Sequence, residues 1–346
     1  MSSRLHPLGY ESKTANLPTG RHYRYVDIHP PQGVKTIVTA LVIHGFPDSA
    51  YGWRHQVKGW SSRGIRLIIP DTLGYNGSSQ PQSPDEYAYK LHSEDYAALI
   101  REIGIPEGEK IVLISHDWGA GIAIRLAQYK PDLVKGIASL CIPFTLAKPA
   151  QELIPPEKLV EFLPSFEYQL FFGSEAASAI LDSKVAKFIN YIYSSGKQIK
   201  SGEVPSWEKK GVFEAWLADD TKSVNSALLT EKEVNTIVAE IKAGAGFSAM
   251  LNYYRTQKVN FEPDKNLPQV FRPEIPKLLV MPNADPALPD FLAAEEDKAE
   301  NIEVVRLEGL CGHWVQLEQP AKIEEIIGDW VEQMNAKGWL ERKSAL

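Results

Sequence analysis

The feature that most constrains the fold is a series of short apolar runs separated by helical patterns. Continuous runs lie at 40–43, 67–69 and 111–114, and the segments 137–141, 278–281 and 302–305 extend the series. Unbroken apolar runs of this length are typical of parallel strands that are buried on both faces of a sheet. Helical stripes with apolar residues spaced by three and four positions lie between and after them, as at 96–103 and 323–330. This alternation predicts an α/β fold with a doubly wound, mostly parallel sheet.

One strand of a different kind precedes the series. Residues 23–28 mix polar and apolar side chains, which is typical of a strand with one partly solvated face. We therefore expect an antiparallel strand at the edge of the sheet.

The strand and helix alternation stops after Cys141 and resumes only near Pro276. A gap that long is not a structureless loop within a compact domain, and its residues are aromatic and compatible with helices. The sequence therefore predicts a core formed by residues 1–142 and 273–346, with a helical cap inserted at 143–272. Ligands of open α/β sheets bind beyond the carboxyl ends of the strands, where such a cap would cover them.

Composition excludes several classes of function. The chain of 346 residues has a net charge of −7 and no basic run, so we expect no nucleic-acid partner. We also expect no membrane span and a cytoplasmic location, because no apolar stretch is long enough and the first residues resemble no secretion signal. The two cysteines form no disulfide framework. The final Ser344-Ala345-Leu346 only partly resembles a peroxisomal address, which leaves that destination open.

The strongest chemical signal is Ser115-His116-Asp117-Trp118-Gly119-Ala120, between the run 111–114 and a helical pattern. Small residues around a central side chain are typical of a nucleophile elbow, a tight strand-to-helix turn that pushes that side chain into the site. The central residue is Asp117. The alternative is that Asp117 only caps the helix, since Asp is a favoured N-cap, but a cap does not require the small neighbours.

A second signal, His44-Gly45-Phe46-Pro47, follows the run 40–43. In this fold class, the corresponding loop and the residue after the nucleophile each supply a backbone N–H to an oxyanion hole. We assign these donors to Phe46 and Trp118.

Two more residues complete the chain order of nucleophile, acid and histidine. Asp285 follows the run 278–281, and His313 follows the run 302–305, so both lie at the carboxyl ends of predicted strands. Asp290 is an alternative acid a short distance downstream.

A carboxylate nucleophile indicates a particular chemistry. A serine that opened a strained ring would form an ether, which histidine and water cannot hydrolyse, whereas a carboxylate forms an ester, which they can. Asp117 is ionised at neutral pH without help. His313 would then activate the water that cleaves the ester, while Asp285 orients the imidazole.

Together these motifs resemble those of the α/β-hydrolase epoxide hydrolases. The resemblance covers nearly the whole chain, from His44-Gly45-Phe46-Pro47 to Gly312-His313-Trp314-Val315-Gln316. It also implies two cap tyrosines that bind the epoxide oxygen. Tyr168 matches the first, and Tyr254 matches the second better than the adjacent Tyr253 does. The implied reaction converts an epoxide and water to a vicinal diol, with no metal and no cofactor.

Two alternatives remain. Haloalkane dehalogenases share the fold, the aspartate and the following tryptophan, but Phe46 offers no side-chain donor for a second halide contact. A noncatalytic ligand-binding protein with the same fold would be expected to lose part of the set Asp117, Asp285 and His313, and none is lost. The natural epoxide and the oligomeric state stay open.

Overall fold

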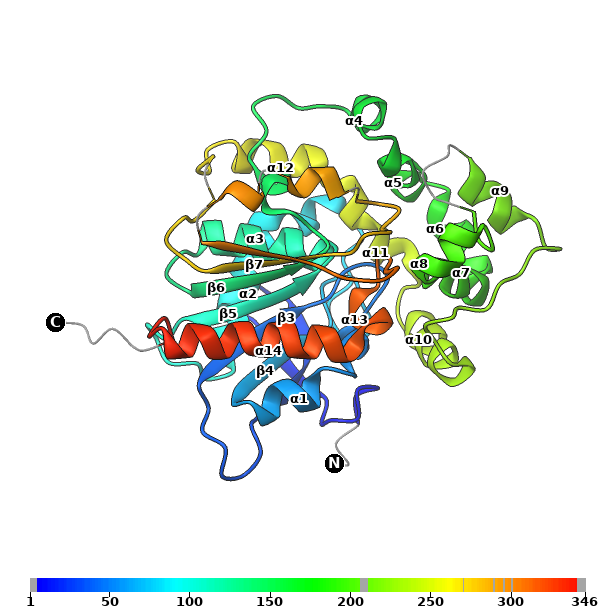
Figure 1. The fold of residues 1–346 in the computed structure, drawn as a ribbon. Coiled ribbons are helices and arrows are strands. Elements are labelled where there is room, and N and C mark those ends of the chain that lie inside the picture. The colour runs from blue at the N-terminus through cyan, green and yellow to red at the C-terminus, as the bar shows by residue number, and fades with distance from the viewer. Residues whose placement is uncertain are drawn as a thin grey trace.

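A computed structural model describes residues 5–205, 211–269, 271–288, 290–294, 296–299 and 301–340. The candidate peroxisomal address at 344–346 lies outside these residues. An eight-stranded sheet forms the centre of the molecule, in the order β1-β2-β4-β3-β5-β6-β7-β8 (Figure 1). The strands are β1 Lys13–Asn16, β2 His22–Ile28, β3 Val38–Ile43, β4 Ile65–Pro70, β5 Ile111–His116, β6 Val134–Leu140, β7 Lys277–Met281 and β8 Ile302–Arg306.

The predicted apolar runs form the parallel part of this sheet. Strands β4, β3, β5, β6, β7 and β8 are parallel neighbours, and every residue of β3, β5 and β7 is buried. The doubly wound α/β fold is confirmed. Because the strands are parallel, their carboxyl ends meet at one edge, where the candidate site residues follow them.

The prediction of an edge strand at 23–28 is wrong in its position. Strand β2 is antiparallel, as expected, but β1 pairs with its outer side and takes the edge. Tyr23 and Val26 are fully buried because β2 lies inside the sheet. The short, mostly polar segment of β1 carries no alternation that would reveal it as a strand.

Helices cover both faces of the sheet. Helices α1 (Val57–Ser62) and α14 (Pro320–Ala336) contact each other on one face. Helices α2 (Tyr89–Glu102) and α3 (Trp118–Tyr129) pack together on the other, with α12 (Gln257–Asp264) beside α2. The predicted signals lie at their ends, since α14 begins at Pro320 and Gly104 follows α2 with a φ of 80°.

Only helices lie between β6 and β7 among the described residues, which agrees with an inserted helical region. Most of them gather on one side of the sheet, at the carboxyl ends of its strands (Figure 1), whereas α12 packs against α2. They are η3 Phe144–Ala147, α4 Pro156–Phe162, η4 Pro164–Phe166, α5 Glu167–Gly173, α6 Ala177–Ser183, α7 Val185–Ile192, α8 Gly196–Ser201, α9 Val212–Ala218, α10 Glu231–Ala243, α11 Phe247–Met250, η5 Leu251–Arg255 and α12. We call this helical region the cap.

Short helical turns connect the core elements near the site. They are η1 Ala50–Trp53, η2 Pro84–Tyr87, η6 Asp290–Ala293, η7 Glu296–Lys298 and α13 Val315–Glu318.

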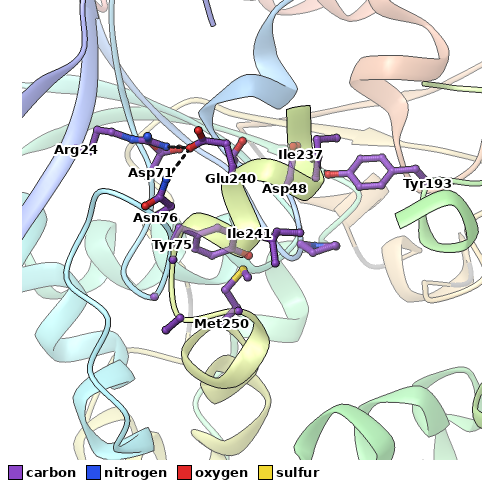
Figure 2. A pocket seen from close by; sticks show the side chains of 16 residues that line it. Arg24, Asp48, Asp71, Tyr75, Asn76, Tyr193, Ile237, Glu240, Ile241 and Met250 are labelled. Atoms are coloured by element: carbon purple, nitrogen blue, oxygen red, sulfur yellow. Dashed lines mark hydrogen bonds and ion pairs between the residues drawn. The ribbon is translucent and has the colours of Figure 1, made fainter. Parts of the chain in front are cut away.

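Ion pairs join the cap to the core through α10. Arg24 of β2 binds Glu240 with an N–O distance of 2.6 Å and also binds Asp71 of the core (Figure 2). Arg54 binds Glu233 at 2.6 Å. Since all four side chains of these two cross-links are at most a quarter exposed, α10 is held against the core at both of its ends.

The described part of the chain contains no helix that is both long enough and apolar enough to cross a membrane.

Candidate active site

Asp117 occupies a strained turn between β5 and α3. Its φ is 52° and its ψ is −128°, a backbone conformation that side chains other than glycine rarely adopt. Glycine is required at two positions near Asp117 because a larger side chain would clash with neighbouring atoms. A Cβ at Gly119 would lie 2.3 Å from the carbonyl oxygen of Ile43, and one at Gly45 would lie 2.3 Å from Oδ1 of Asp117. The sequence 115–120 therefore forms an elbow of the predicted kind.

The Asp117 side chain does not cap α3. No hydrogen bond joins its carboxylate to the first turn of the helix. Instead, the backbone N–H of Phe46 donates to Oδ1 of Asp117 over 2.8 Å. Trp118 is the first residue of α3, so its N–H has no acceptor within the helix. Both predicted oxyanion donors thus belong to residues beside the Asp117 carboxylate, and the bond from Phe46 is formed.

His313 lies between two carboxylates. Its Nδ1 is 2.8 Å from Oδ2 of Asp285, and its Nε2 is 3.6 Å from Oδ2 of Asp117. The backbone N–H of Ala287 donates to the other oxygen of Asp285 over 2.8 Å. The structure therefore brings together Asp117, Asp285 and His313. Asp290 begins η6, and its side chain lies outside the described residues.

This arrangement shifts the ionisation of the histidine and the nucleophile. Burial alone would lower the pKa of His313, but the charges and hydrogen bonds of Asp285 and Asp117 outweigh it and raise the pKa to about 10. Burial alone would raise the pKa of Asp117, but the hydrogen bond and charge of His313 outweigh it and lower the pKa below its usual value. At neutral pH the site therefore holds an imidazolium between two carboxylates.

The sequence analysis missed two residues that bind the backbone carbonyl of His313. Nε2 of His116 lies 2.9 Å from the carbonyl oxygen of His313, and the Cys141 thiol donates to the same oxygen over 3.2 Å. His116 stands within the elbow motif, which was a signal for its proximity. The position of Cys141 depends on the pairing of β5 with β6.

The same three residues form a group that could be considered for a metal, since their donor atoms lie within 4.8 Å of one another. Their chemistry does not favour one. The His313 ring is engaged with Asp285 and Asp117, and burial raises the pKa of the Cys141 thiol well above its usual value. We interpret the group as a support for the imidazole.

Tyr168 and Tyr254 both face this centre from the cap. Tyr168 lies in α5 and Tyr254 in η5, and their ring centroids are 6.3 Å apart. The Tyr254 ring also packs edge-on against Trp118 at 5.1 Å. The neighbouring Tyr253 points elsewhere, because its hydroxyl donates to the carbonyl of Leu73 over 2.8 Å. The geometry favours Tyr254 over Tyr253 as a site residue.

An aromatic cluster connects the oxyanion donor to the two cap tyrosines. The Phe172 ring lies 5.2 Å from the ring of Phe46, 5.7 Å from that of Tyr168 and 4.9 Å from that of Tyr254. Phe46 itself packs against Tyr254 at 5.2 Å. The residue that donates to Asp117 is therefore held by the cap as well as by the core.

Two cavities lie near the junction of core and cap. One, with a volume of about 210 Å³, is lined by Asp117, Trp118 and Tyr168, and mostly by apolar side chains around them. The other is about 20 Å³, the size of a water molecule, and is lined by the ion-paired Arg24, Asp71 and Glu240 (Figure 2). Of these two cavities, the larger one has room for an organic molecule next to the Asp117 carboxylate.

Comparison with known proteins identifies the family and the fold of the chain. The alpha/beta hydrolase fold family matches residues 40–320. An epoxide hydrolase of Neurospora crassa is 32% identical over 85% of this chain and 86% of its own length. The bifunctional epoxide hydrolase 2 of Rattus norvegicus is 30% identical over 84% of this chain, which spans 50% of that longer protein. The crystal structure of epoxide hydrolase A from Mycobacterium thermoresistibile superposes with a TM-score of 0.73 at 26% identity, covering 93% of this chain and 98% of that one.

The elbow generates a prediction about stability. Gly119→Ala should lower the free energy of unfolding by about 2 kcal/mol, because the added Cβ meets backbone atoms that cannot move aside. Gly173→Ala is the matched control, since its Cβ would approach only the Tyr254 carbonyl oxygen, at 3.3 Å. Urea unfolding of the two variants measures the difference. Equal stabilities would contradict a tight β3 to α3 contact.

The raised pKa of His313 predicts a pH dependence. The folded protein keeps a proton on His313 that the unfolded chain releases near pH 6.5, so stability should fall as pH rises from 6.5 toward 10. The contribution is at most about 1.4 kcal/mol per pH unit for one proton. Urea unfolding across this range should give a steeper decline for the wild type than for His313→Gln. Parallel curves would show that His313 gains no proton on folding.

Proposed function

The chain belongs to the alpha/beta hydrolase fold family and to its epoxide hydrolases, and we propose on this premise that it opens epoxides through a covalent ester on Asp117. The observation that carries the proposal is the carboxylate of Asp117 in a strained elbow, with Nε2 of His313 at 3.6 Å from it. A carboxylate in this position is a nucleophile whose ester a histidine can hydrolyse with water.

In the first step, an Asp117 oxygen attacks a ring carbon and the bond from that carbon to the epoxide oxygen breaks. Oδ1 already accepts the N–H of Phe46, so Oδ2 is the better placed attacking atom and Oδ1 becomes the ester carbonyl. The electron pair of the broken bond stays on the epoxide oxygen. The hydroxyls of Tyr168 and Tyr254 donate to that oxygen as its charge develops.

The proton balance follows from the ionisation of His313. Ester formation removes the negative charge of Asp117, which is one of the two charges that raise the pKa of His313. The imidazolium can then release its proton, which neutralises the new alkoxide by way of the tyrosine hydroxyls. Neutral His313 is left as a base.

In the second step, His313 takes a proton from water while the water oxygen attacks the ester carbonyl carbon. Negative charge appears on Oδ1, where the N–H groups of Phe46 and Trp118 stabilise it. Collapse of this intermediate releases the diol and restores the Asp117 carboxylate and the His313 imidazolium. The overall reaction adds one water to one epoxide, so neither a cofactor nor a metal is needed.

Two details support an epoxide over a halide as the substrate. The Phe46 side chain has no hydrogen-bond donor, and its ring is packed among cap aromatics. A halide leaving group needs N–H donors but no proton, whereas an alkoxide needs the proton that two tyrosine hydroxyls can pass on. A noncatalytic role has less support, because the charges around His313 are those that a base catalyst requires.

The mechanism predicts that His313→Gln accumulates the ester. Ring opening needs the Asp117 carboxylate and the two tyrosine hydroxyls, which the variant keeps, so loss of the His313 proton should slow alkylation without stopping it, whereas hydrolysis needs the imidazole base. With styrene oxide in excess, intact mass spectrometry should show protein heavier by one substrate, and turnover should fall by at least about a hundredfold. His29→Gln is the control, because the His29 side chain is 61% exposed and has no part in the proposed mechanism.

Labelled water distinguishes this mechanism from direct attack. In a single turnover with excess enzyme in oxygen-18 water, the label should enter Asp117, because the new diol oxygen comes from the carboxylate. Label found first in the diol would mean that water attacks the epoxide directly. That result would refute the ester.

The two cap tyrosines should act in the first step. Tyr168→Phe or Tyr254→Phe should slow alkylation by on the order of a hundredfold, and the double variant should nearly abolish it. Rapid-quench measurement of the ester separates this step from hydrolysis. Tyr253→Phe is the matched control, since it loses a hydroxyl that binds the Leu73 carbonyl. Near-normal alkylation in the double variant would mean that both tyrosines only pack in the cap. It would also reopen the dehalogenase alternative.

A further inference from the structure

The cavity beside Asp117 extends along α3. Trp118, Gly121 and Arg125 all line it, and their spacing of three and four residues places them on one face of that helix. Gly121 lies about 6 Å beyond Asp117 along the helix axis, at 1.5 Å per residue. A substrate attacked by Asp117 would therefore have its substituent over Gly121.

Tyr89, the first residue of α2, also lines this cavity, and its hydroxyl lies against Gly121. A Cβ at Gly121 would lie 2.7 Å from the Tyr89 hydroxyl oxygen, closer than an unstrained contact allows. The absence of a side chain at 121 thus gives the hydroxyl its place. The main chain of Tyr89 is fixed as well, because its N–H donates to Oδ1 of Asn260 over 2.8 Å.

The Tyr89 hydroxyl differs from those of Tyr87 and Tyr253. The hydroxyls of Tyr87 and Tyr253 donate to the carbonyls of Pro81 and Leu73, at 2.9 and 2.8 Å. Within the described ranges, no hydrogen bond joins the Tyr89 hydroxyl to another residue. Tyr89 is partly buried and lines the cavity, so its hydroxyl is accessible to a ligand there and can donate a hydrogen bond to it.

Arg125, which lines the same cavity, packs against the Tyr89 ring. Its guanidinium carbon lies 5.8 Å from the ring centroid, and its Nε is fixed by Asp264 at 2.7 Å. Burial raises the pKa of Tyr89 above its usual value, although the Arg125 charge opposes this. The hydroxyl therefore stays protonated at neutral pH and can donate.

We propose that the Tyr89 hydroxyl is a specificity subsite that donates a hydrogen bond to an uncharged oxygen of the substrate, a few bonds from the epoxide ring. The preferred substrates would be epoxides with an ether, hydroxyl or carbonyl oxygen at that distance, such as glycidyl ethers. A carboxylate fits less well, because the Arg125 guanidinium that lines the cavity is already paired with Asp264 and the Asp117 charge would repel it. The proposal rests on the proposed function, which places the epoxide at Asp117.

The test compares two epoxides that differ by one atom. Phenyl glycidyl ether carries the acceptor oxygen, and its analogue has a methylene group in the same place. The wild type should have the higher kcat/KM for the ether. Tyr89→Phe should lower the ratio of the two kcat/KM values by about fivefold, because it removes one hydrogen bond to an uncharged group and leaves the ring.

Tyr87→Phe is the matched control. It deletes a phenol hydroxyl two positions away that does not line the cavity, so the ratio should stay at the wild-type value. An unchanged ratio in Tyr89→Phe, or an equal fall in Tyr87→Phe, would overturn the subsite. The ratio also separates this role from a purely structural one, which would lower both kcat/KM values together.

Binding of the two corresponding diols separates this proposal from the proposed function, because it requires no turnover. Calorimetry should show that the wild type prefers the ether diol and that Tyr89→Phe loses about fivefold of this preference. If the wild type prefers the ether diol in calorimetry but turns over no epoxide, the proposed function is refuted and the subsite is kept. Turnover that depends on Asp117, with no preference in either assay, would refute the subsite alone.

Discussion

The strained turn at Asp117 is the constraint on which the site depends. A positive φ at a residue other than glycine costs about 1–3 kcal/mol, and the surrounding packing must supply it. Here β5 and α3 fix the two ends of the turn, while Gly119 and Gly45 allow the backbone of the β3 loop to approach it. That approach brings the N–H of Phe46 to 2.8 Å from the carboxylate. The strained turn that exposes the Asp117 carboxylate is therefore also where the proposed oxyanion donor meets it.

Charge compensation is the second interaction that organises the site. Two carboxylates on one side of a buried imidazole would repel each other, but on opposite sides they both stabilise its charged form. Asp117 and Asp285 are arranged in this second way around His313. The proposed ester removes one of the two charges during each cycle, so the histidine would change from an acid to a base at the step that requires a base. The bonds from His116 and Cys141 to the His313 carbonyl keep the ring in position throughout.

The aromatic cluster makes the cap part of the candidate active site. The Phe172 ring packs against the rings of Phe46, Tyr168 and Tyr254. This one side chain therefore contacts both the proposed oxyanion donor and the two tyrosines proposed to bind the epoxide oxygen. Aromatic pairs at these distances have preferred orientations and each contributes about 0.5–1.5 kcal/mol beyond burial. The ion pairs of Arg24 and Arg54 with α10 hold the cap in the position that this contact needs.

The sequence alone determined the local features. Apolar runs predicted the parallel strands, and the small residues around Asp117 predicted the elbow, because burial and turn geometry depend on neighbours in the chain. Tertiary structure decided the rest. The bond from His313 to Asp285, the orientation that separates Tyr254 from Tyr253, and the hydroxyl of Tyr89 over Gly121 each join segments far apart in sequence. Such contacts depend on how helices pack against the sheet and on which rotamers that packing allows, and neither is encoded in a local pattern.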